Sequence, residues 1–131
     1  MRFKSKQTAI STVHDYYNTF YKENEFSKTL IIMDDDKLVG YINYWILFDH
    51  AEINKICVDD EYRRKGYASL LMEKAFEAFK KAECLSISLE VRVSNISAQK
   101  LYEKFGFVTV VVKKEYYQNG EDANYMVKGV Y

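Results

Sequence analysis

The chain has 131 residues, 48% hydrophobic and 29% charged, a composition that fits one globular domain over residues 1–131 and excludes a disordered chain. Its 19 basic and 19 acidic residues cancel, so it lacks the basic excess on which non-specific nucleic-acid binding depends. No apolar run approaches the length of a membrane span, and no apolar signal core follows Met1. We therefore expect a cytoplasmic protein without a nucleic-acid or membrane partner.

The first half of the chain predicts one helix followed by three strands. Apolar residues between Thr8 and Asn24 recur at spacings of three and four, which is typical of an amphipathic helix. The apolar runs 29–33, 38–48 and 51–58 then predict three strands. Short polar turns join them, so neighbouring strands should be antiparallel.

The second half predicts helices that alternate with strands. Apolar residues within 68–79 share one helical face, residues 85–93 alternate as a strand, and a second helical stripe runs over 98–105. The closing strands are predicted at 107–117 and 125–131. A strand–helix–strand unit in the middle implies one parallel pair. The predicted class is therefore α/β (an α+β arrangement), with a central mixed, mostly antiparallel sheet and flanking helices.

The cysteines and histidines indicate no special chemistry. Cys57 and Cys84 each lie in an apolar, strand-like segment, so buried thiols are favoured over a disulfide between them. The two histidines, His14 and His50, show none of the close spacings to the cysteines that metal sites use. We therefore expect no metal.

The loop between the third strand and the next helix is rich in basic residues. The first turn of a helix presents unpaired N–H groups and a partial positive charge, which make it a ready anion site. Gly66 would let the backbone approach a phosphate closely. A solvated basic loop that precedes a helix is the alternative. The candidate binding residues are Arg63, Arg64, Lys65, Gly66, Tyr67, Ala68 and Ser69.

Within this loop, Arg63-x-x-Gly66-x-Ala68 resembles the Arg/Gln-x-x-Gly-x-Gly/Ala motif of GNAT acetyltransferases, which holds the pyrophosphate of coenzyme A. The resemblance implies the GNAT fold, with acetyl-CoA as co-substrate. It also implies that the strand backbone at Ile56 and Val58 pairs with the pantetheine arm.

A longer match covers residues 89–107, which resemble the bacterial ribosomal-protein-alanine N-acetyltransferases and the related N-terminal acetyltransferases of archaea and eukaryotes. The resemblance implies Glu90 as the base for the acceptor amine and Tyr102 as the acid for the leaving thiolate, with direct attack in a ternary complex. It adds Asn95 and Ala98 as coenzyme contacts. From the residues alone, Tyr102 also fits a core position, Glu90 the solvent side of a strand, and Asn95 a helix N-cap.

The acceptor side is predicted from the same resemblance. Tyr116, Tyr117 and Glu121 match the loop and closing strand that face the peptide, which implies a protein N-terminus, such as that of a ribosomal protein, as acceptor. Glu121 flanks a turn, so a solvated loop is the alternative. Two other functions stay open: acetylation of a small amine or internal lysine, and a coenzyme-A-binding module without catalysis. The exposed closing strand permits a homodimer without requiring one.

The N-terminal region departs from these relatives, which usually carry a strand and two helices there. Only one helix is predicted before residue 29, so the aromatic segment 16–26 is the candidate lining of a more open acceptor pocket. This difference in the N-terminal region leaves the identity of the acceptor open.

Overall fold

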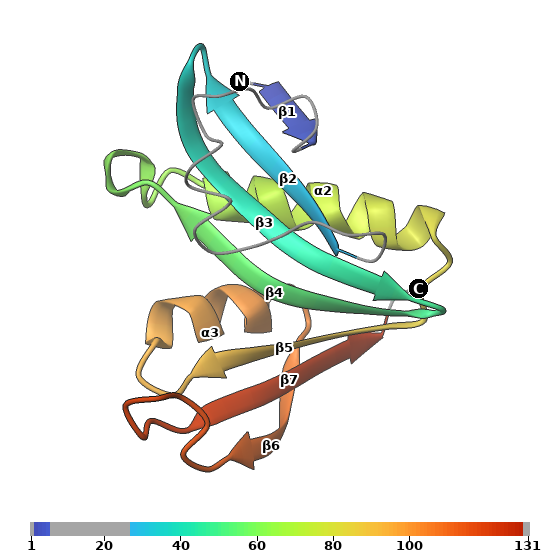
Figure 1. Cartoon of the computed structure of the whole chain (residues 1–131), viewed down its shortest axis with the longest axis vertical. Coiled ribbons are helices and arrows are strands. Elements are labelled where there is room, and N and C mark those ends of the chain that lie inside the picture. The colour runs from blue at the N-terminus through green and yellow to red at the C-terminus, as the bar shows by residue number, and fades with distance from the viewer. Residues whose placement is uncertain (1, 6–26, 130–131) are drawn as a thin grey trace.

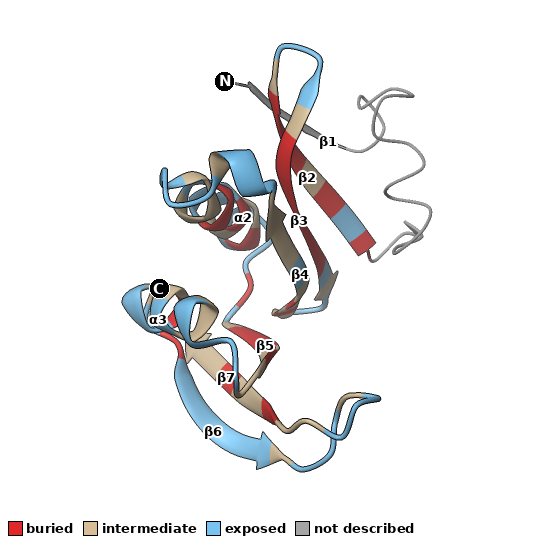
Figure 2. Cartoon of the chain, turned by 90° about the vertical axis from the view of Figure 1, so that its left-hand side faces the viewer, coloured by how far each residue is buried: buried red, intermediate tan, exposed pale blue. Residues whose placement is uncertain are grey.

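The computed structural model describes residues 2–5 and 27–129, and within them it shows a seven-stranded sheet with two α-helices on one face (Figure 1, Figure 2). The strand order is β1-β2-β3-β4-β5-β7-β6, and every neighbouring pair is antiparallel except β4 and β5. The predicted mixed sheet with one parallel pair is therefore confirmed. The elements are β1 (Arg2–Ser5), β2 (Ser27–Asp34), β3 (Lys37–Leu47), β4 (His50–Val58), a 3₁₀ turn (Asp60–Tyr62), α2 (Tyr67–Lys81), β5 (Ser86–Arg92), α3 (Ile96–Lys104), β6 (Val108–Lys113) and β7 (Ala123–Gly129).

Two strands differ from the prediction. Strand β1 was not predicted, because its four residues are too few to show a clear alternation, yet it pairs antiparallel with β2. Strand β6 ends at Lys113 instead of continuing to residue 117. The chain turns there, because Glu115 has a φ of 50° and its N–H donates to Asp122 Oδ1 at 2.9 Å.

The N-terminal predictions are not all covered by the structure. The helix predicted between Thr8 and Asn24, and the aromatic segment 16–26, lie outside the described residues. Neither of the two α-helices in the described part is long and apolar enough to cross a membrane.

Helices α2 and α3 lie on the same face of the sheet and bury a common core (Figure 2). The ring of Phe79 on α2 meets Tyr44 of β3 edge to face, with centroids 4.9 Å apart. Tyr102 of α3 and Phe107 belong to the same core. The predicted apolar stripe of α2 is therefore confirmed as its sheet-facing side, with buried residues Leu71, Met72, Ala75 and Phe79.

Strands β4 and β5 pair with each other over only part of their length. The parallel register joins residues 50–53 of β4 to residues 86–89 of β5. Asn54 then forms a β-bulge against β3, and β4 turns away from β5. Residues 55–58 and 90–92 are consequently not paired with each other, and the two strands diverge toward the loop before α2 and toward α3 (Figure 1). We call this region the β4–β5 opening.

A buried amide network fixes the bulge that creates this opening. Asn54 Nδ2 donates to Asn43 Oδ1 at 2.9 Å, and Asn43 Nδ2 in turn donates to Thr29 Oγ1 at 2.9 Å and to the Lys28 carbonyl at 3.0 Å. Asn43 is fully buried, but both ends of its amide are hydrogen-bonded, so its burial carries little penalty. The divergence of β4 from β5 is thus held by side chains of β2, β3 and β4.

Candidate functional site

The N-terminus of α2 lies beside the β4–β5 opening and has no side-chain cap (Figure 1). Its N-cap residue Gly66 has a φ of 85°, and the first helical bond runs from the Leu70 N–H to the Gly66 carbonyl at 3.1 Å. The N–H groups of residues 67–69 therefore precede the first helical bond. Helix α3 is instead capped by Asn95, whose Oδ1 accepts from the Ala98 N–H at 3.2 Å. The α2 end is the one left open for an anion.

The three basic residues of the loop are all exposed, but they differ in their partners. Arg63 Nε donates to the Val58 carbonyl at 3.2 Å and lies 3.1 Å from Asp60 Oδ1, so Arg63 ties the loop to the end of β4. Within the described part of the chain, no carboxylate pairs with Arg64 or Lys65. The charge of these two side chains is therefore available to a bound anion.

The other predicted coenzyme contacts lie on both sides of the opening. Ile56 and Val58 are in the part of β4 that has left β5, and their side chains pack partly on the helix-side core. Asn95 and Ala98 are at the start of α3, across the opening from β4 (Figure 1). The structure thus brings together two groups of candidate residues that lie 37 to 42 residues apart in the sequence and belong to separate motifs.

Glu90 and Tyr102 approach the opening from opposite faces of the sheet. Leu89 and Val91 of β5 are buried in the helix-side core together with Tyr102. Because side chains alternate along a strand, Glu90 points to the other face. The Glu90 side chain is 15% exposed, and its Oε1 lies 2.8 Å from Lys113 Nζ. The two predicted catalytic residues therefore flank the opening, one on each side.

The Tyr102 hydroxyl is buried and has no hydrogen-bond partner among the described residues. Tyr102 is 6% exposed, and its ring packs edge to face with Phe107, with centroids 6.0 Å apart. Burial raises the pKa of the Tyr102 hydroxyl far above its ordinary value, so the group keeps its proton at neutral pH. Because buried hydroxyls are nearly always hydrogen-bonded, to protein, ordered water or a ligand, the Tyr102 hydroxyl is a candidate contact for a bound ligand.

Glu52 of β4 is a carboxyl group that the sequence analysis did not select. It pairs in the parallel register with Ser88, two residues before Glu90, so Glu52 and Glu90 share one face of the sheet. Burial, and then the negative charge of Glu90, raise the pKa of Glu52, whereas the charge of Lys113 lowers it. Polar and apolar residues alternate over 50–53, and this alternation is the sequence signal that marks Glu52 as a polar residue on a strand.

The loop before β7 holds the predicted acceptor residues against the end of β5. The rings of Tyr116 and Tyr117 meet edge to face at 5.0 Å, and the Arg92 guanidinium lies 3.9 Å from the Tyr117 ring centroid. Glu121 accepts hydrogen bonds from the Ser94 N–H at 2.9 Å and from Arg92 Nη1 at 3.1 Å, and these bonds lower the pKa of its carboxyl. Glu121 therefore fixes the loop, and its contact with an acceptor stays a prediction.

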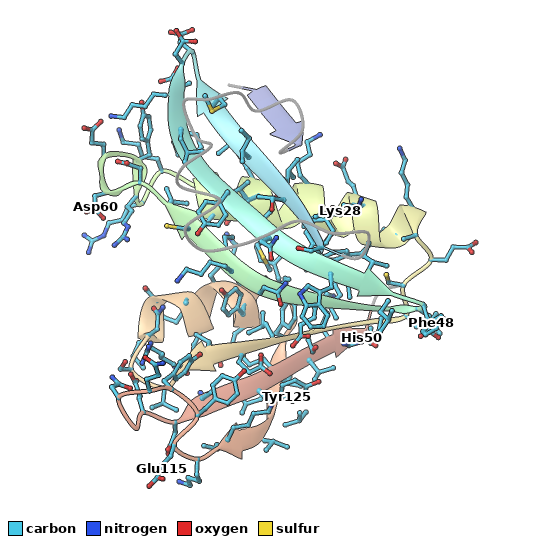
Figure 3. All side chains as sticks on the ribbon, in the orientation of Figure 1. Lys28, Phe48, His50, Asp60, Glu115 and Tyr125 are labelled. Atoms are coloured by element: carbon cyan, nitrogen blue, oxygen red, sulfur yellow. The ribbon has the colours of Figure 1, made fainter. Side chains whose placement is uncertain are left out.

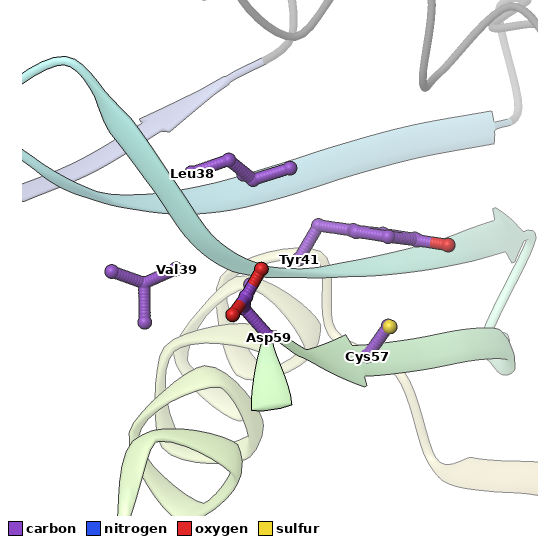
Figure 4. Close-up of a pocket in the computed structure, with 6 residues that line it drawn as sticks. Leu38, Val39, Tyr41, Cys57 and Asp59 are labelled. Carbon is purple, nitrogen blue, oxygen red and sulfur yellow. The ribbon is translucent and has the colours of Figure 1, made fainter. Parts of the chain in front are cut away.

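A small hollow lies where β3 approaches the end of β4 (Figure 4). The hollow is lined by Leu38, Val39, Gly40, Tyr41, Cys57 and Asp59. Strand β3 comes so close here that a Cβ on Gly40 would lie 2.5 Å from the Cys57 carbonyl oxygen.

Cys57 packs with the apolar cluster on the face opposite the helices, away from Tyr102, and Cys84 is buried. Both cysteines of the chain are described and are thiols, as predicted.

Comparison with known proteins identifies relatives of this chain. Residues 3–107 match the family described as acetyltransferase (GNAT) family. The chain is 42% identical over 120 residues to a Bacillus subtilis (strain 168) protein named as a candidate ribosomal protein bS18-alanine N-acetyltransferase, with 91% of this chain and 79% of that protein covered. It is 40% identical over 107 residues to an N-alpha-acetyltransferase of Saccharolobus solfataricus, with 72% and 64% covered. The crystal structure of the ribosomal-protein-S18-alanine N-acetyltransferase from Escherichia coli shares the fold, with a TM-score of 0.81, 24% identity, and 98% and 94% covered.

The family match includes every element that borders the opening, from β4 and the loop before α2 to β5 and α3. Members of this family are acyltransferases that use acetyl-CoA, and the two relatives above are named as N-acetyltransferases. The chain therefore belongs to the acetyltransferase (GNAT) family and is an N-acetyltransferase.

Proposed function

We propose that this chain, as one catalytic domain over residues 1–131, transfers the acetyl group of acetyl-CoA to the α-amine of a protein N-terminus, such as that of a ribosomal protein. The observation that carries the proposal is the β4–β5 opening, with the buried Tyr102 hydroxyl on one face and the Glu90 carboxylate on the other. The names of the relatives support this acceptor. The cytoplasm, where ribosomal proteins are made, is the proposed location.

The residues around the opening fit a coenzyme with a diphosphate at one end and a thioester at the other. The uncapped N-terminus of α2, with Arg64 and Lys65 exposed beside it, suits the diphosphate. The edge of β4 beyond its bulge suits an arm with amide groups, which can add to a strand edge by hydrogen bonding. The acetyl thioester supplies the carbonyl that an amine attacks. The proposed contacts are Ile56, Val58, Arg63, Arg64, Lys65, Gly66, Tyr67, Ala68, Ser69, Asn95 and Ala98.

Two side chains handle protons in the proposed reaction. An ammonium group cannot attack a carbonyl, so Glu90 accepts a proton from the acceptor, directly or through one water. The amine nitrogen bonds to the acetyl carbon, and as the carbon–sulfur bond breaks Tyr102 gives its proton to the leaving sulfur from the other face. The second proton that the nitrogen loses then restores the Tyr102 hydroxyl. The raised pKa of Tyr102 keeps that proton in place at neutral pH until the thiolate develops. Tyr116, Tyr117 and Glu121 border the acceptor side.

A panel of acceptors tests this function. The purified protein and acetyl-CoA would be mixed with Ala-, Ser- and Met-initiated peptides, with a lysine peptide whose N-terminus is blocked, and with polyamines. We expect thiol release and an acetyl mass shift only with free peptide N-termini. Transfer confined to lysine or polyamines would replace the proposed acceptor. Coenzyme binding without transfer to anything would favour a non-catalytic module.

Gly66→Ala should weaken acetyl-CoA binding about tenfold. A Cβ at Gly66 would meet no atom within 4 Å, so it would project into the open space before α2. The φ of 85° is also strained for alanine, by about 1–2 kcal/mol, so the loop is driven away from its present course. Calorimetric titration with acetyl-CoA measures the Kd.

Gly120→Ala is the matched control for this variant. Gly120 also has a φ of 85° and open surroundings, but it lies in the loop before β7. Both variants should lose similar stability in thermal unfolding, and only Gly66→Ala should change the Kd. Equal affinities in the two variants would contradict a diphosphate site at the start of α2.

A further inference from the structure

Lys113 reaches across the sheet to the proposed catalytic base. It is the last residue of β6, the edge strand, and β7 lies between β6 and the β5 strand that carries Glu90. Its Nζ lies 2.8 Å from Glu90 Oε1, 4.6 Å from the Tyr125 ring centroid and 5.3 Å from the Tyr116 ring centroid. Figure 3 shows Tyr125 on β7, beside the strand of Glu90. One ammonium group is thus bounded by a carboxylate and two aromatic rings.

This combination of groups recognises a primary ammonium ion. The carboxylate accepts a charge-assisted hydrogen bond from N–H, and the aromatic faces attract the positive charge. The protonated α-amine of a peptide and the side-chain amine of lysine both present a compact, cationic NH₃⁺ group on a saturated carbon. The same three side chains that surround Lys113 Nζ can therefore surround the amine of an acceptor.

We propose that Glu90, Tyr116 and Tyr125 form the subsite for the acceptor ammonium, and that Lys113 fills this subsite until the acceptor displaces it. The proposal rests on the proposed function, because it names the acceptor group of that reaction. It assigns Lys113 a competing role, which differs from a role in holding Glu90 in place.

Lys113 is suited to leave the subsite. Its side chain is 38% exposed and starts from an edge strand, so it can turn into solvent without breaking the sheet. The acceptor ammonium takes the place of the Lys113 ammonium beside Glu90, so this mostly buried carboxylate is not left without a cation when Lys113 leaves. When Lys113 leaves, Glu90 loses its paired cation and the neighbouring Glu52 loses a nearby positive charge, so both carboxyl groups then favour binding of another cation.

The competing role predicts a change in KM without a change in kcat. Lys113→Met keeps most of the length of the side chain and removes its charge, so the KM for a free-N-terminus peptide should fall about two- to fivefold, with kcat unchanged. Lys114→Met is the matched control. Lys114 is the next residue, is 80% exposed and pairs with Asp122 at 3.2 Å, and its replacement should change neither constant. A fall in kcat with Lys113→Met would show that Lys113 positions Glu90, and unchanged constants would show that it does not compete. Either result overturns the proposal.

A measurement without turnover separates this proposal from the proposed function. Lysine side chains carrying ¹³C-methyl groups would be followed by NMR, with the Lys113 signal assigned by its loss in Lys113→Met. Glu90, chiefly through its hydrogen bond, raises the pKa of Lys113, so the paired state has a distinct titration. Addition of methylammonium chloride should move the Lys113 signal to that of an exposed lysine, whereas sodium chloride at equal concentration should move it less. Equal responses to the two salts would overturn the subsite even if no acceptor were acetylated.

Discussion

Tyr102→Phe should lower kcat at least about tenfold while leaving the fold intact. The variant keeps the ring that packs against Phe107 and loses only a hydroxyl without a hydrogen-bond partner in the described part of the chain. Removing this hydroxyl breaks no hydrogen bond with the described residues, so the melting temperature should not fall. Turnover at saturating acetyl-CoA and acceptor, together with calorimetric melting, measures both effects.

Tyr62→Phe is the matched control for this loss. The Tyr62 hydroxyl donates to Asp34 Oδ2 at 3.2 Å, so its removal should lower the melting temperature slightly and leave kcat unchanged. The two variants should therefore show opposite patterns. Wild-type turnover in Tyr102→Phe would remove Tyr102 from the mechanism and leave it as a core residue beside Phe107.

Elements in which an apolar pattern repeats several times were predicted best from the sequence, and short elements were predicted worst. Helix α2 has 15 residues, enough for its apolar stripe to repeat several times, and the predicted stripe over 68–79 lies within one residue of its start and two of its end. Strand β1 has four residues and was missed, because its place depends on pairing with β2. The end of β6 was also missed, because a single side chain, Asp122, turns the chain there by accepting from the Glu115 N–H.

Prediction of the site was limited by contacts between distant strands. Resemblance to family motifs, each within a short window of sequence, selected the Gly66 loop and the pair Glu90 and Tyr102. Lys113 is 23 residues from Glu90, and the two meet only because β6 and β5 flank β7 in the sheet. Glu52 meets Glu90 through the parallel pairing of β4 with β5. A local pattern could mark Glu52 and Lys113 as polar residues on strands, but it could not show that they share a face with the base.

Glu90→Gln should lower kcat about 100-fold near neutral pH and remove the acidic limb of its pH profile. A carboxylate accepts the ammonium proton only when it is ionised, so wild-type kcat should fall as the pH is lowered. Glutamine preserves the size of the side chain but cannot accept that proton. The pH dependence of kcat for wild type and variant, measured at saturating acceptor, is the test.

The pKa of Glu52 determines where any acidic limb that remains in the pH profile of Glu90→Gln should lie. In the wild-type protein, burial and then the charge of Glu90 raise the pKa of Glu52, so Glu52 takes up a proton at a higher pH than an isolated carboxyl would. In Glu90→Gln the charge beside Glu52 is gone, and its pKa falls. A rate that depends on Glu52 in this variant would therefore have its acidic limb at lower pH than in wild type.

The pH profiles of two variants then identify the group that takes the proton. If Glu90 is the base, Glu90→Gln has a low rate without the acidic limb, and Glu52→Gln keeps most of its kcat because the Glu90 carboxylate is still present. If Glu52 takes the proton, Glu90→Gln keeps much of its rate with the limb moved to lower pH, and Glu52→Gln is the inactive variant. An acidic limb unchanged in Glu90→Gln would exclude Glu90 as the base, because its charge would then influence neither the reaction nor the neighbouring carboxyl.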